Sequence, residues 1–124
     1  MTEDELQKRL EATLPARDRY DLFVEECQDQ DVRLRFTPGA GEDWRMPALL
    51  ALVDIALRAA AGVDATLTHL SLTRLREPDP GADIIALARI IRRDRDVVHA
   101  EAWLFSHAVV EAMLHATATL SKKG

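Results

Sequence analysis

Residues 46–62, MPALLALVDIALRAAAG, predict the helix around which the rest of the chain is organised. Pro47 suits the first helical turn, and Gly62 suits the position just past the last turn. Alanine and leucine dominate between them, and both favour helices. The segment is apolar on nearly every face, and it spans roughly 24 Å, which is too short to cross a membrane. We therefore expect a helix that is surrounded by other elements of the fold.

Length and composition indicate one globular domain over residues 1–124. Of the 124 residues, 48% are hydrophobic and 30% are charged. The net charge of −5 argues against a general nucleic-acid binder, because phosphate contacts need a basic surface. The one cysteine, Cys27, excludes an internal disulfide and is interpreted as a core residue. The charged N-terminal stretch lacks an apolar signal core, so we expect a cytoplasmic protein that binds neither nucleic acid nor membrane.

The remaining patterns predict an N-terminal helix and an antiparallel sheet. Thr2 and Glu5 have the spacing of a capping box, which begins a helix over about residues 3–14. Short apolar or alternating runs predict strands at 22–27, 32–36, 66–76, 84–91, 97–105 and 109–120. Alanine recurs at alternate positions in the last three runs, which lets a helix approach closely. The order of elements predicts an α+β fold in which a curved antiparallel sheet wraps around the central helix.

Three segments carry a resemblance to a known family. Residues 47–56, PALLALVDIA, are similar to the helix pattern G-x-x-x-A-L-x-D-x-A, and residues 67–81, LTHLSLTRLREPDPG, to the pattern V-T-x-x-L-x-I-x-F-L-R-P-x-x-x-G. Residues 116–120, ATATL, are similar to a last strand A-x-A-T-x. In this order and spacing, residues 22–121 resemble the hotdog fold of the PaaI-like acyl-CoA thioesterases, in the hydroxybenzoyl-CoA thioesterase superfamily. The resemblance implies a homodimer with its sheets joined edge to edge, often paired into a tetramer, with acyl-CoA at the dimer interface.

Asp54 is the first candidate catalytic residue. In the family that the chain resembles, a carboxylate on the central helix acts as general base or nucleophile in thioester hydrolysis. Arg58 follows four residues later on the same helical face, so the sequence also allows a structural ion pair between the two. The resemblance favours the catalytic interpretation over the structural one.

The start of the helix supplies the next candidates. Arg45, Met46 and Pro47 occupy the positions where many PaaI-like enzymes have His-Gly-Gly, although a subset has Ser-Gly-Pro. The resemblance implies that the thioester lies near this helix start, where backbone N–H groups polarise its carbonyl. Pro47 has no N–H, so the donor would be the N–H of Ala48, with Met46 as a second. We interpret Arg45, Met46 and Pro47 as substrate contacts, although Arg45 also fits an ordinary surface ion pair.

Other candidate contacts lie on the strands. Thr68 could orient a water or Asp54, and His69 could do the same or serve as a hydrogen-bonded strand residue. Arg92 and Arg93 could meet the phosphates of coenzyme A or simply be solvated. The histidines have no metal-ligand spacing, and the sequence contains no P-loop or dinucleotide fingerprint, so we expect neither metal nor cofactor.

The sequence therefore predicts an acyl-CoA thioesterase that hydrolyses a small or medium acyl-CoA at the interface of a homodimer or tetramer, with Asp54 as base or nucleophile. The alternative is a non-catalytic hotdog module that binds acyl-CoA or another hydrophobic ligand. The replacement of the His-Gly-Gly pattern at positions 45–47 favours that alternative.

Overall fold

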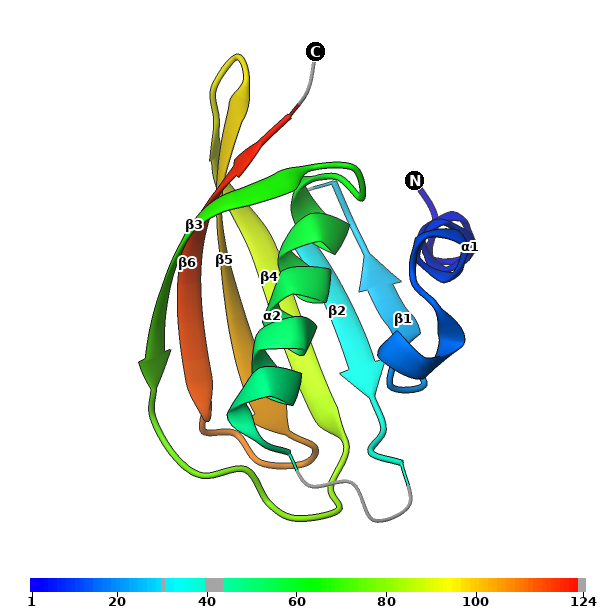
Figure 1. Cartoon of the computed structure of the whole chain (residues 1–124), viewed down its shortest axis with the longest axis vertical. Helices are drawn as coiled ribbons and strands as arrows, with labels where there is room; N and C mark the ends of the chain where they lie inside the picture. Colours follow the sequence, from blue (N-terminus) through cyan, green and yellow to red (C-terminus); the bar gives the residue numbers. More distant parts are fainter. Residues whose placement is uncertain (30, 40–43, 123–124) are drawn as a thin grey trace.

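The computed structural model describes residues 1–29, 31–39 and 44–122, which form a curved sheet with a long helix on one face (Figure 1). The sheet has six strands in the order β1-β2-β4-β5-β6-β3, and all neighbours are antiparallel. This arrangement confirms the predicted α+β hotdog architecture. The elements in chain order are α1 (Glu3–Thr13), the short 3-10 helix η1 (Ala16–Asp18), β1 (Phe23–Cys27), β2 (Asp31–Phe36), α2 (Met46–Ala61), β3 (Thr66–Arg74), β4 (Ile84–Arg93), β5 (Val97–Ser106) and β6 (Leu114–Ser121).

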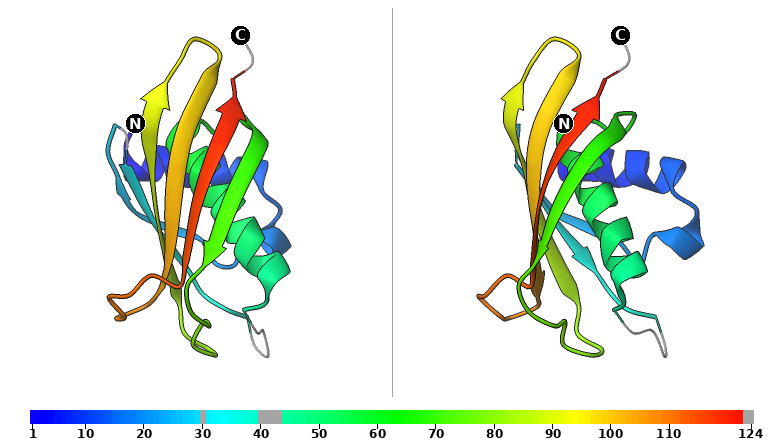
Figure 2. Two further views of the ribbon diagram at one scale, coloured as in Figure 1. Left: turned by 90° about the vertical axis from the view of Figure 1, so that its left-hand side faces the viewer. Right: turned by 60° about the vertical axis from the view of Figure 1, so that its left-hand side comes forward.

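Helix α2 packs on the inner face of the sheet, and no described helix covers the outer face (Figure 2). Small side chains make this packing possible: Ala88, Ala102 and Ala116 lie opposite one another across β4, β5 and β6, and all are buried. Leu52 and Leu57 of α2 are fully buried against this surface. Burying each leucine contributes roughly 1.5–3 kcal/mol, so α2 and the alanine-lined face together form the core.

One stripe of α2 is less buried than the sequence led us to expect. Leu50 is exposed, and the side chains of Asp54 and Arg58 are partly exposed, whereas Leu49, Leu52, Val53 and Ala56 are buried. The residues of the stripe are spaced four apart and therefore share one helical face. The sheet covers α2 from one side only, so the helix is not enclosed by the described part of its own chain.

Helix α1 forms as its capping box predicts, and it covers one edge of the sheet. The Thr2 side chain accepts a hydrogen bond from the Glu5 backbone N–H, and Glu5 accepts one from the Thr2 N–H in return. Gln7 Nε2 donates to the Leu22 carbonyl at 2.9 Å, and Gln7 Oε1 accepts from the Val24 N–H at 2.7 Å. The Gln7 side chain therefore joins α1 to the beginning of β1.

The last predicted strand is too long at its beginning. The sequence predicts a strand from residue 109, but β6 begins at Leu114. The chain turns first, because Ala108 adopts a φ of 68° and the Val109 N–H donates to the Ser106 carbonyl. Val110 is 92% exposed as a result. Two adjacent valines favour a strand locally, but the turn chemistry of residues 106–109 determines where pairing starts.

Two further observations concern membrane and metal binding. None of the helices in the described ranges is both long and apolar enough to span a membrane. Among the same residues, no group of three or more His, Cys, Asp or Glu side chains is arranged to hold a metal ion.

Candidate active site

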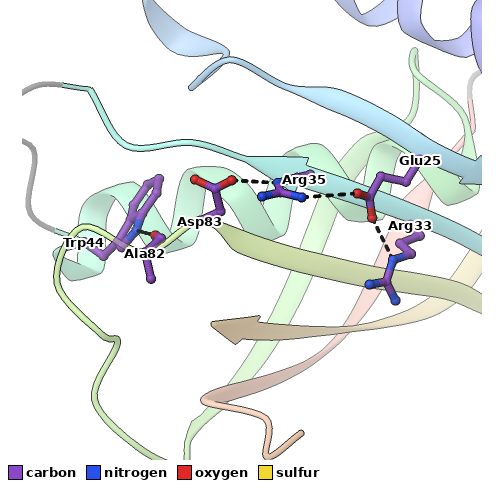
Figure 3. Close-up of polar contacts among 6 residues, drawn as sticks. All are labelled: Glu25, Arg33, Arg35, Trp44, Ala82 and Asp83. Carbon is purple, nitrogen blue, oxygen red and sulfur yellow. Dashed lines mark hydrogen bonds and ion pairs between the residues drawn. The ribbon is translucent and has the colours of Figure 1, made fainter. Parts of the chain in front are cut away.

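The start of α2 is fixed by Trp44, which is almost completely buried. Its indole Nε1–H donates to the Ala82 carbonyl at 2.7 Å (Figure 3). Its ring centroid also lies 5.7 Å from that of Tyr20. Ala82 lies two residues before the first residue of β4, so this bond holds the beginning of the helix against the beginning of that strand. The Trp44 side chain therefore anchors the start of α2 to the region before β4.

The first turn of α2 presents few backbone donors. Arg45 is the N-cap, but its side chain makes no capping hydrogen bond, and its carbonyl accepts the Leu49 N–H at 3.0 Å. Pro47 lies in the first turn and contributes no N–H. The N–H groups of Met46 and Ala48 point out of the helix start, which carries a partial positive charge. These are the two N–H groups that the family resemblance predicts as donors to the oxyanion.

Asp54 lies on the open stripe of α2 and pairs with Arg58. Asp54 Oδ2 is 3.2 Å from Arg58 Nη2, and the two side chains are 38% and 21% exposed, respectively. A carboxylate on an apolar helix would be costly if it were buried, but on this stripe it keeps contact with solvent. The predicted ion pair forms, and Asp54 also remains accessible to a ligand placed over α2.

Arg58 is only partly satisfied by this pair. Its Nε is buried and has no hydrogen-bond partner among the described residues. Guanidinium groups can bind carboxylates through several N–H donors. The single contact to Asp54 therefore leaves some of the N–H donors of Arg58 unused.

Thr68 lies at an irregular point of β3. The register of β3 against β6 shifts between Leu67 and His69, and Thr68 is the extra residue at this shift. Its hydroxyl donates to the Thr119 carbonyl at 3.0 Å. The predicted polar contact of Thr68 is thus made to the neighbouring strand, not to Asp54.

The structure places His69 on the outer face of the sheet. His69 is opposite Thr119, and directly opposed residues of antiparallel strands project to the same face. Thr119 points away from α2 toward His99, with Thr119 Oγ1 and His99 Nδ1 3.5 Å apart, whereas the neighbouring Ala118 and Leu120 are buried in the core. Within one subunit His69 and Asp54 are separated by the sheet, and a role for His69 at the substrate stays a prediction.

Arg92 and Arg93 are far along the molecule from the start of α2. Arg93 lines a hollow together with Ala59 and Ala61 at the other end of the helix. Arg92 forms an ion pair with Asp94 at 3.2 Å and lies 3.1 Å from His99. One chain therefore does not bring these arginines to the helix start, and their contact with coenzyme A phosphates stays a prediction.

The sequence did not reveal a polar cluster on the outer face. Glu101 accepts from Arg89 Nε at 2.7 Å and lies 3.1 Å from His115 Nε2. Trp103 stacks on His115 with ring centroids 4.9 Å apart, and the Arg89 guanidinium lies 5.6 Å from the Trp103 ring centroid. These are cross-strand pairs, so only the register of β4, β5 and β6 could have identified them.

This cluster determines the ionisation of Glu101. Burial acts to raise the pKa of Glu101, but the hydrogen bonds from Arg89 and His115, with their charges, outweigh it and hold the pKa below its ordinary value. A second, more exposed cluster joins Arg33, Glu25, Arg35 and Asp83 near β1 (Figure 3). Both clusters lie on the face opposite Asp54, so neither belongs to the candidate site.

The comparisons with known proteins agree on the fold. No protein-family profile and no curated protein matches the sequence. Among solved structures, zebrafish thioesterase superfamily member 2 is 17% identical with a TM-score of 0.82, and the match covers 99% of each chain. A provisionally named thioesterase from a Silicibacter species is 23% identical with a TM-score of 0.82, covering 98% of this chain and 91% of that one.

A third structure is the PaaI protein of the E. coli phenylacetic acid degradation operon, which is 10% identical with a TM-score of 0.76. That match covers 97% of this chain and 95% of the PaaI chain. At these identities the likeness concerns the backbone, and it extends over nearly the whole length of all three proteins. The chain therefore has the hotdog fold of the PaaI-like thioesterases, as its sequence resemblance predicts.

Proposed function

We propose that this protein is an acyl-CoA thioesterase that hydrolyses a small or medium acyl-CoA. The observation that carries the proposal is Asp54, a partly exposed carboxylate on the uncovered stripe of α2 in a hotdog fold. Asp54 is the only acidic residue of α2, and Arg58 is the only other charged residue of this helix.

The proposed substrate site lies between two copies of the chain that meet through β3. This strand ends the sheet, and most of its residues are exposed. Leu67, Leu70 and Leu72 on its inner side are only partly buried. A second sheet joined at this edge would extend the inner face and cover the stripe that carries Leu50 and Asp54, which accounts for the apolar surface left open in one chain.

In the proposed mechanism, Asp54 acts as general base. Its carboxylate accepts a proton from water while the water oxygen attacks the thioester carbonyl carbon. The N–H of Ala48, with that of Met46, donates to the carbonyl oxygen as it becomes negative. The tetrahedral intermediate then expels the coenzyme A sulfur, which takes the proton back from Asp54, so the products are the carboxylic acid and free coenzyme A.

The test is thiol release from short, medium and aromatic acyl-CoAs by the wild type and Asp54→Asn. We expect the substitution to lower kcat by about 10²- to 10⁴-fold, the usual loss when a general base is removed. Asp4→Asn, an equal change on the exposed first turn of α1, is the matched control and should retain activity. Equal activity of Asp54→Asn and the wild type, with the same oligomeric state, would exclude Asp54 as the base.

The ion pair of Asp54 with Arg58 favours a second candidate, a module that binds acyl-CoA without hydrolysing it. The pair gives Asp54 a structural role, and Pro47 reduces the number of oxyanion donors. This function predicts that acyl-CoA raises the melting temperature with no thiol release, and that Asp54→Asn leaves that increase intact. Thiol release by the wild type would exclude it.

A further inference from the structure

A hollow lies at the end of α2 that is remote from the candidate site. Its volume is about 250 Å³, and it is lined by residues of α1, the end of β1, the beginning of β2, the last turn of α2 and the end of β4. A second hollow of about 350 Å³ adjoins it and shares Arg9, Val63 and Lys122. The lining combines apolar and cationic side chains, among them Leu6, Val32, Val63, Arg9, Arg93 and Lys122.

Two of the three cations that line this hollow have no ion-pair partner among the described residues. In the described parts of the chain, neither the Arg93 nor the Lys122 side chain takes part in an ion pair. Arg9 pairs with Asp64 at 3.6 Å, but the Asp64 side chain is 90% exposed, so this interaction is weak. Among the described residues, Asp29 is the only acidic one that lines the first hollow.

This charge arrangement requires an explanation in a chain whose net charge is −5. The carboxyl end of a helix attracts cations, but its partial charge is only about half an elementary charge. Arg9, Arg93 and Lys122 together exceed that charge, and attraction to the helix end does not explain the apolar floor formed by Leu6 and Val63. An anion that also carries an apolar group would satisfy both features.

We propose that this hollow binds a small organic acid. Arg9, Arg93 and Lys122 hold the acid group, which is a carboxylate or a phosphate monoester, and a short apolar tail lies against Leu6 and Val63. A volume of about 250 Å³ accommodates a short acyl chain. A carboxylic acid of this size is also what thioester hydrolysis would release, but the binding does not depend on that activity.

Calorimetric titration of the full-length chain with sodium hexanoate and with hexyl phosphate tests the proposal. We expect the Arg93→Gln/Lys122→Gln variant to bind both probes at least 10-fold more weakly than the wild type. Lys8→Gln/Arg17→Gln removes the same charge from exposed positions that do not line the hollow, and it should bind like the wild type. Tighter binding of hexyl phosphate assigns a phosphate monoester, and tighter binding of hexanoate assigns a carboxylate. No measurable binding, or an equal loss in both double variants, would overturn the proposal.

Cys27 offers an independent readout, because it is the only cysteine of the chain and it lines the hollow. Hexanoate should slow the modification of Cys27 by a thiol reagent, and inorganic phosphate should protect less because it has no tail. The Asp54→Asn variant should bind and be protected like the wild type, whatever its thioesterase activity. Binding without protection of Cys27, or loss of binding in Asp54→Asn, would place the ligand elsewhere and overturn the proposal.

Discussion

The two edge strands of the sheet, β1 and β3, differ in how far the described chain covers them. At the β1 edge, α1 is joined to the strand region by the two hydrogen bonds of Gln7, and Glu3 Oε2 accepts from the Cys27 N–H at 3.0 Å. At the β3 edge, the described chain provides no comparable cover, and Ser71 and Thr73 are exposed. Exposed edge strands readily pair with strands of other chains, so proteins usually cover an edge strand that is not meant to pair. The difference indicates that β3 is the edge available to a partner.

The strongest test of this difference is a charge placed on β3. We expect Ser71→Asp to raise the dissociation constant of the proposed homodimer about 100-fold, or about 2.7 kcal/mol, because pairing through β3 would bring like charges close together. Thr117→Asp is the matched control, since Thr117 lies directly opposite Ser71 on β6 and is exposed on the same face. Sedimentation velocity measures both.

Either of two results would contradict the assignment of β3. A wild type that stays monomeric at high concentration would show that the edge is unpaired in solution. An equal weakening of association by Ser71→Asp and Thr117→Asp would show that the interface involves the outer face of the sheet in place of its edge.

Truncation of Gln7, which joins α1 to the β1 edge, should lower the stability of the protein. Gln7→Ala removes an exposed hydrogen bond to Glu11 and the two hydrogen bonds to the strand region, which leaves the Leu22 carbonyl and the Val24 N–H without their partner. We expect the free energy of unfolding to fall by about 1–3 kcal/mol, as for other part-buried groups that lose a partner. Lys8→Ala, on an exposed position of the same helix, should change it by less than about 0.5 kcal/mol. Urea unfolding followed by fluorescence gives both values, and equal values would mean that Gln7 does not secure the edge.

Sequence patterns predicted the parts of the molecule that depend on local chemistry. The caps of α1, the limits of α2 set by Pro47 and Gly62, and the alternating alanines of β4, β5 and β6 all follow from neighbouring residues. The pairing of Asp54 with Arg58 followed from helical spacing in the same way.

Features that depend on long-range register were not predictable from these patterns. The shift between Leu67 and His69 determines which face His69 occupies, and it has no signal in the local sequence. The open stripe of α2 depends on how far the sheet extends around the helix, which composition does not specify. The polar clusters on the outer face likewise appear only once strands distant in sequence are aligned.

The two polar clusters on the outer face, one in the half of the sheet nearer β3 and one in the half nearer β1, also differ in the burial of their carboxylates. The Glu101 side chain, in the half of the sheet nearer β3, is 11% exposed, whereas that of Glu25, in the half nearer β1, is 22% exposed. Glu101 contacts both Arg89 and His115, and its pKa lies below the ordinary value of 4.5. Ionised Glu101 therefore stabilises the folded state fully at pH values above the ordinary pKa of 4.5. This stabilisation is lost as the pH falls through the lower pKa that Glu101 has in the folded protein.

Glu101→Gln should accordingly reduce the free energy of unfolding most at neutral pH, and the difference from the wild type should shrink as the pH falls below 4.5. Chemical unfolding at a series of pH values from 7 downward measures this difference, with Glu25→Gln as the matched change in the other cluster. A difference that stays constant with pH would show that Glu101 contributes through packing alone. A difference that shrinks more for Glu25→Gln than for Glu101→Gln would reverse the comparison, because the more exposed carboxylate would then be the one whose charge the fold depends on.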